Sequence, residues 1–162
     1  MFKLFKNFTR SRSNEKSISS LSEEQLDALI NFIANIIFTQ KQLIVNQNGG
    51  SLPENATDEW SIGYVYGVVD TSFQVSNISM DSSSAELIKQ VYNRTFGNNK
   101  GSEFFNTANI CASIFAEDME FTQGCKAGHY DVIENINSEE AIKLSWWRHI
   151  LQNNSVMTAT SI

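Results

Sequence analysis

The sequence predicts an all-α fold, a single compact helical domain of five or six helices within 162 residues. Three observations lead to this prediction. The only proline is Pro53, which favours long uninterrupted helices over a turn-rich β architecture. Apolar residues recur at helical spacing along most of the chain, and no segment alternates with a period of two. Several of the expected helices also begin at capping sequences.

The charge of the chain is unevenly distributed. Residues 1–17 carry five basic side chains and one acidic one, a local charge of +4, which leaves −10 on the remainder of a chain whose formal net charge is −6. We therefore expect a basic N-terminal tail over residues 1–20, a globular domain over 21–152 and a frayed C-terminus over 153–162. The acidic body argues against nucleic acid as the main partner and would suit a basic protein partner.

The basic tail has three interpretations. It is a solvated terminus, a cleaved organellar transit peptide, or a peripheral membrane contact. The membrane contact would be made by aromatic and basic residues that recur at helical spacing, namely Phe2, Lys3, Phe5 and Lys6. We expect no transmembrane segment, because the most apolar stretch, 26–38, is short and interrupted by polar residues.

The first predicted helix covers about 22–45. It begins at a capping box formed by Ser22 and Gln25. Its polar residues recur once per turn and leave a narrow stripe to meet water, so the helix is either central or covered by a second subunit. These polar residues are Asp27, Asn31, Asn35 and Thr39. A loop then leads to the second helix, 58–76, capped by Thr57 or Asp58.

The third predicted helix, 84–96, is capped by Ser83 with Glu86 and stops at Gly97. The next five residues, Gly-Asn-Asn-Lys-Gly, read as a loop. From Ser102 to about Asn135 the helical period continues, either as one helix or as two with a bend near Glu117. The sequence Asn-Ser-Glu-Glu at 137–140 predicts the cap of a last helix.

Two stretches of the chain, 59–74 and 120–135, share the pattern E-[WF]-[ST]-x-G-x3-G-x2-D-x3-[QN] at an offset of 61 residues. Such similarity is typical of a duplicated helical unit, related here by a pseudo-twofold axis. The glycines of the pattern are Gly63 and Gly67 in the first copy and Gly124 and Gly128 in the second. Glycine disfavours helix by about 1 kcal/mol relative to alanine, so we expect these four to permit a close helix–helix contact.

Asp70 and Asp131 occupy matching positions in the two repeats, on the same helix face as the glycines. If the glycine faces pack together, these carboxylates lie near the repeat axis, where they must find donors, share a proton or bind a cation. One interpretation is structural, with each aspartate accepting hydrogen bonds from a helix N-terminus, a tyrosine or an amide. The other is a metal or polar-ligand site. No cofactor is required by the sequence.

No catalytic motif is present among the phosphate-binding, zinc-binding and nucleophile-elbow patterns that sequence can reveal. Cys111 and Cys125 are expected to be reduced thiols, which with the lack of a secretory signal predicts a cytoplasmic protein. Trp146 and Trp147 cannot both face one core, so at least one is a possible anchor for a partner. The sequence thus favours a non-enzymatic interaction or regulatory module that forms a homodimer. A small ligand-binding domain or hydrolase, and a peripheral membrane protein, are the alternatives.

Overall fold

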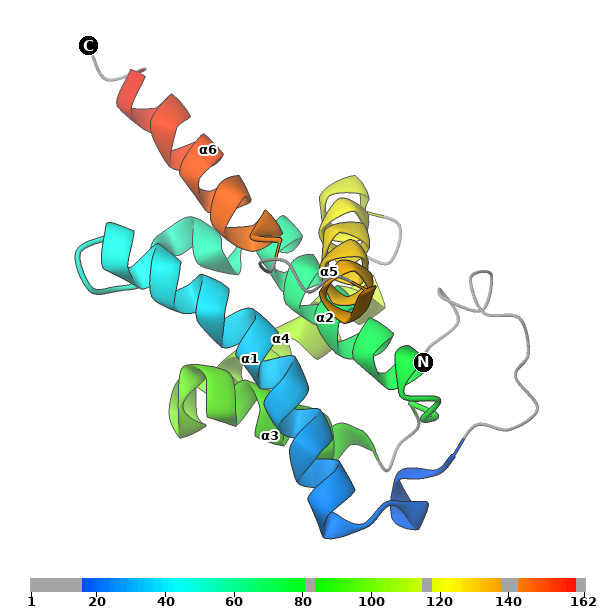
Figure 1. Ribbon diagram of the computed structural model, residues 1–162. Coiled ribbons are helices and arrows are strands. Elements are labelled where there is room, and N and C mark those ends of the chain that lie inside the picture. Colours follow the sequence, from blue (N-terminus) through cyan, green and yellow to red (C-terminus); the bar gives the residue numbers. More distant parts are fainter. Residues whose placement is uncertain (1–15, 81–83, 115–117, 138–142, 160–162) are drawn as a thin grey trace.

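The computed structural model describes residues 16–80, 84–114, 118–137 and 143–159, and over 154–159 its description is limited to the backbone. Within these ranges the fold is all-α and has no strand, as the sequence predicts. Six α-helices follow one another along the chain (Figure 1): α1 Glu23–Gln47, α2 Glu59–Val75, α3 Ser84–Phe96, α4 Asn98–Ile114, α5 Met119–Asn137 and α6 Ser145–Ala159.

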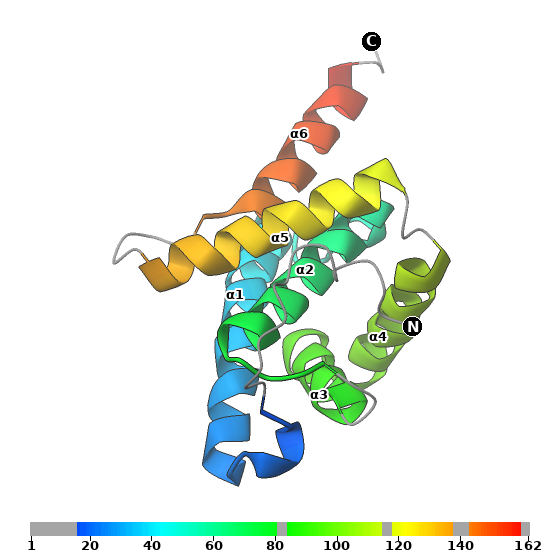
Figure 2. The ribbon, with the colours of Figure 1, turned by 90° about the vertical axis from the view of Figure 1, so that its right-hand side faces the viewer.

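Helix α2 lies at the centre of the fold, and 12 of its 17 residues are buried. Helix α5 packs along one side of it, running in the same direction, while α1, α3 and α4 gather on the other side (Figure 2). Helix α6 contacts α1 and α5 near its N-terminus and then projects away from the body. This arrangement places the glycine-rich faces of α2 and α5 against each other.

The predicted caps of the first two helices are confirmed. Ser22 and Gln25 form a reciprocal capping box at the start of α1. Asp58 caps α2 by accepting a hydrogen bond of 2.7 Å from the backbone amide of Ser61. The predicted cap at Ser83 lies outside the described residues.

The junction between α3 and α4 differs from the prediction. The stretch 97–101 was expected to be a loop, but α4 already begins at Asn98. Gly97 alone turns the chain, because its φ of +85° is a left-handed conformation that ends one helix and redirects the next. A Cβ atom on Gly101 would lie 2.6 Å from the backbone of Asn93, so the two helices meet too closely for a loop between them.

The helical stretch from Ser102 forms two helices, the second of the two alternatives. Helix α4 ends at Ile114 and α5 begins at Met119, where Asp118 Oδ1 accepts amide hydrogen bonds from Glu120 and Phe121. The predicted cap at 137–140 falls largely outside the described residues. Lys143 and Leu144 are not helical, and the last helix runs from Ser145 to Ala159, into the stretch expected to be frayed. At the other end, Lys16 pairs through its backbone with Asn77 and Ser79, within the predicted tail.

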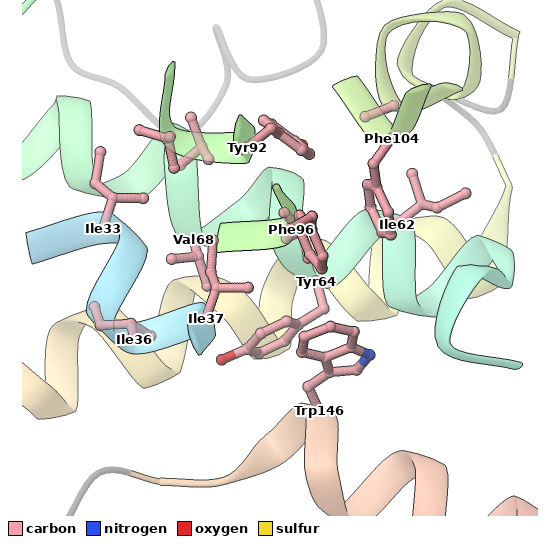
Figure 3. Packing of buried hydrophobic residues seen from close by; sticks show 14 of the residues in the cluster. Ile33, Ile36, Ile37, Ile62, Tyr64, Val68, Tyr92, Phe96, Phe104 and Trp146 are labelled. Carbon is pink, nitrogen blue, oxygen red and sulfur yellow. The ribbon is translucent and has the colours of Figure 1, made fainter. Parts of the chain in front are cut away.

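The core is built from buried side chains of all six helices, and Figure 3 shows its part around Tyr64 and Trp146. Ile33 and Ile37 of α1, Val68 of α2 and Tyr92 of α3 are each 2% exposed or less. By length and composition, α1 is the one helix of the described ranges that could also cross a membrane, and 44% of its apolar window is buried inside the fold. The buried apolar residues of α1 pack against α2, α3 and α6, as in the core helix of a folded domain.

Candidate functional site

The four repeat glycines lie where α2 and α5 touch. A Cβ atom added to Gly63 or Gly67 would lie 2.2 Å from the carbonyl oxygen of Phe121 or Cys125, respectively. On the other helix, a Cβ added to Gly124 would lie 2.0 Å from the carbonyl oxygen of Trp60. Any side chain at these positions would push the two backbones apart, so glycine is required for the contact.

The contacts are reciprocal under the 61-residue offset. Gly67 meets the backbone of Cys125, and Gly128, its counterpart in the second stretch, meets the backbone of Tyr64, the counterpart of Cys125. Two parallel helices related by a twofold axis have this pattern of contacts. Whether the chain arose by duplication stays a prediction.

Asp131 is the centre of a buried polar cluster. Its side chain is 0% exposed. Its Oδ2 atom accepts hydrogen bonds from the Tyr64 hydroxyl at 2.8 Å and from the Ser145 backbone amide at 3.2 Å, and a longer one of 3.4 Å from Gln40. Its Oδ1 atom accepts a 2.6 Å bond from the Ser145 hydroxyl. The cluster therefore joins four helices at one carboxylate.

Gln40 completes the cluster from α1. It donates through Nε2 to the Tyr64 hydroxyl, and its Oε1 accepts from the backbone amides of Trp146 at 2.9 Å and Trp147 at 3.3 Å. Together, Asp131 and Gln40 accept hydrogen bonds from the first three backbone amides of α6. Those amides have no partner within their own helix, so side chains of α5 and α1 cap α6 across the fold.

Burial governs the electrostatics of the cluster. Desolvation raises the pKa of Asp131, although hydrogen bonds from Ser145, Tyr64 and Gln40 oppose it. Desolvation, reinforced by the charge of Asp131, raises the pKa of Tyr64 well above its usual value. The phenol therefore stays protonated and serves as a permanent donor to the carboxylate.

Asp70 has a different environment from its counterpart. It is 9% exposed, and its carboxylate accepts a 2.6 Å hydrogen bond from Gln74, one turn further along α2. Burial raises the pKa of Asp70 to about 6, and the bond from Gln74 only partly offsets this. Cys125 stands in α5 where the repeat would place the counterpart of Tyr64, and burial followed by the charge of Asp70 raises its pKa to about 12.

The structure does not assemble the two aspartates into one site. Among the described residues, Asp70 is bonded by Gln74, whereas Asp131 is bonded by Tyr64, Ser145 and Gln40. Among the described residues, no group of three His, Cys, Asp or Glu side chains is placed to hold a metal ion. The arrangement at Asp131 is that of the structural interpretation, with a helix N-terminus, a tyrosine and an amide as donors.

Both histidines are engaged in helix packing. His129 lies 3.1 Å from the Thr71 hydroxyl. His149 stacks on the Trp60 ring and its Nε2 lies 3.1 Å from Asp58. Burial would raise the pKa of Asp58, but the hydrogen bonds from His149 and Ser61 prevail and lower it. The contact thus ties α6 to the cap of α2.

Trp146 cannot be the partner anchor that the sequence suggested. It is fully buried, because the first turn of α6 points it into the core beside Tyr64 and Phe96. Trp147 is partly buried, and its indole nitrogen donates a 2.9 Å hydrogen bond to Gln47 of α1. Cys111 and Cys125 are free and buried. The proposed membrane residues Phe2, Lys3, Phe5 and Lys6 lie outside the described residues.

Sequence reasoning missed three members of the cluster, Gln40, Tyr64 and Ser145. One signal was available for Gln40, since it is a polar residue of α1 that falls outside the once-per-turn polar stripe. Tyr64 lies within an apolar run, where a phenol is ordinarily read as core. Comparison of the chain with protein-family models, with curated proteins and with solved structures gives no match.

Proposed function

We propose that this protein is a non-enzymatic helical interaction module of the cytoplasm that self-associates. The observation that carries the proposal is the set of large apolar side chains that the fold leaves at its surface. Within the described ranges these are Phe38, Val75, Ile110, Ile114, Met119, Tyr130 and Ile136, each between 39% and 71% exposed. Three of them, Ile110, Ile114 and Met119, lie close together in the sequence, and exposed apolar groups that lie together are typical of protein-binding surfaces.

The buried polar cluster supports this reading indirectly. The carboxylate of Asp131 accepts four hydrogen bonds within the fold, so its burial is accounted for by the fixing of α6 rather than by chemistry on a substrate. A rigid helical scaffold with apolar side chains outside suits binding of another protein surface.

Sedimentation velocity of the full chain tests the proposal. From about 10 μM to about 1 mM protein, the range of weak dimers, the average mass should rise from monomer towards dimer. A mass that stays at the monomer value over the whole range would contradict self-association.

The ligand-binding alternative now rests on Asp70. A buried carboxylate with a pKa raised to about 6 is the kind of group that a cation or a polar ligand would relieve. Thermal-shift measurements with a panel of divalent cations test this, with Asp70→Asn as the matched control. A rise in melting temperature that Asp70→Asn removes would favour a ligand site over the interaction module.

A further inference from the structure

Three of the seven large apolar side chains that are exposed in the described ranges lie where α4 ends and α5 begins. Met119 is 71% exposed, Ile114 67% and Ile110 57%. Ile110 and Ile114 are one turn apart on α4 and are both exposed, whereas Ala108 and Cys111 of the same helix are buried. Figure 2 shows the end of α4 and the start of α5 at the same edge of the molecule.

The sequence on either side of this corner is acidic. Between Lys100 and Lys126 it holds four acidic residues and no basic one, and Asp118 and Glu120 of these are described on either side of Met119. Glu120 is exposed directly beside Met119. An apolar patch with an acidic rim calls for an occupant with apolar side chains and positive charge.

The chain contains a segment with these properties. Residues 1–8, Met-Phe-Lys-Leu-Phe-Lys-Asn-Phe, alternate aromatic and aliphatic side chains with lysines, and the first 17 residues carry +4. The described chain begins at Lys16, which is fixed to Asn77 after α2. Phe5 lies eleven residues before Lys16, and an extended stretch of that length spans up to about 38 Å, about the width of a domain of this size, so the segment can reach the corner of its own copy.

We propose that the N-terminal segment, residues 2–8, docks on the α4–α5 corner of the same chain, with Phe2, Leu4 and Phe5 against Ile110, Ile114 and Met119 and its lysines facing the acidic rim. Tethering favours contact within one copy, because a segment joined to the domain by a short linker has an effective concentration of about millimolar. The contact would cover Ile110, Ile114 and Met119, and it would leave Phe38, Val75, Tyr130 and Ile136 as the exposed apolar side chains available for self-association.

Paramagnetic broadening in the full chain tests the proposal. A nitroxide is attached at Asn7→Cys, and the methyl groups of isoleucine and methionine are labelled for NMR. Cys111 and Cys125 are buried, and burial raises the pKa of both thiols, so the label goes to the new cysteine. We expect at least a twofold loss of signal for Ile114 and Met119.

Ile136 is the matched control methyl, since it is 50% exposed at the other end of α5, about 25 Å from Met119 along the helix axis. Its signal should change little. Lys3→Glu with Lys6→Glu should abolish the broadening at the corner, and about 1 M salt, which screens the attraction between opposite charges, should reduce it.

Three results would overturn the proposal. The first is equal broadening of Ile114 and Ile136, which would mean that the segment has no preferred position. The second is broadening in a mixture of nitroxide-bearing unlabelled protein with labelled protein free of nitroxide, which would place the contact between copies. The third combines two observations: the corner signals stay unbroadened, and the full chain floats with vesicles of anionic lipid while the Lys3→Glu, Lys6→Glu variant does not. That result would assign the segment to a membrane surface.

Discussion

The Tyr64 hydroxyl of α2 donates a 2.8 Å hydrogen bond to Asp131 of α5, at the place where α6 begins. Tyr64 lies one turn after Trp60, whose backbone contacts Gly124. The backbone of Tyr64 itself contacts Gly128. The glycines bring the two backbones together, and the phenol and carboxylate then fix their register. Because Asp131 also binds Ser145, one polar contact aligns three helices.

Replacing Asp131 by alanine should destabilise the protein strongly. Three donors, on Tyr64 and on the amide and hydroxyl of Ser145, would lose their acceptor in a buried place, at a cost of about 3 kcal/mol. For a chain of this size the melting temperature should fall by about 6–12 °C. Asp131→Asn keeps one acceptor oxygen and should lose less, and the exposed Lys126→Ala is the control. An unchanged melting point for Asp131→Ala would show that the cluster does not hold the fold.

Replacing Gln40 by methionine, a side chain of similar size, should loosen α6 locally. The amides of Trp146 and Trp147 lose the acceptor that caps them, while the rest of the core keeps its packing. Native-state hydrogen exchange should show these two amides opening about tenfold more often, which corresponds to about 1.4 kcal/mol. Thr39→Met, at the exposed neighbouring position, should leave them unchanged. If exchange increases equally throughout α2 instead, Gln40 supports global stability and not α6 in particular.

Alanine at Gly67 or Gly124 should destabilise the fold even though alanine is the better helix former. The added methyl group would lie 2.2 Å or 2.0 Å from a backbone oxygen, which cannot move without separating α2 from α5. We expect a net loss of about 1–3 kcal/mol in the free energy of unfolding, measured by urea titration. Gln123→Ala, an exposed neighbour on α5, should change it by less than about 0.5 kcal/mol. Equal stability of Gly67→Ala and the wild type would mean that the close contact is not maintained in solution.

Local features of the fold were predictable because local signals determine them. The caps at Ser22 and Asp58 follow from short-range hydrogen bonding, and the glycine contact follows from small residues one turn apart on a repeated pattern. The start of α4 at Asn98 was not predictable from composition, since its polar residues resemble a loop. Packing of Gly101 against α3, a tertiary contact, decides that the segment is helical.

The different roles of Asp70 and Asp131 could not be predicted from the repeat, because both have the same local pattern. What separates them comes from distant segments. Ser145 and Gln40 reach Asp131, whereas the hydrogen bond at Asp70 comes from its own helix. The pair Tyr64–Asp131 also corresponds, under the offset, to Cys125–Asp70, and a thiol is a much weaker donor than a phenol.

Asp70→Asn should stabilise the protein at pH 7.5 and have little effect near pH 3.5. The folded-state pKa of Asp70 is raised to about 6 from an ordinary value of 3.8, so the fold disfavours its ionised form. Below both values the carboxyl is neutral in the folded and unfolded states and contributes no difference. As pH rises through this interval the wild type loses up to about 3 kcal/mol, an order-of-magnitude figure that the asparagine variant does not lose. Asparagine can still accept the bond from Gln74. Urea titrations of both proteins at the two pH values measure the difference in the free energy of unfolding. Asp131 is present in both proteins, so its own titration cancels in the comparison. A variant that is less stable than the wild type at pH 7.5 would show that the charge of Asp70 is held by a favourable partner, such as a bound cation.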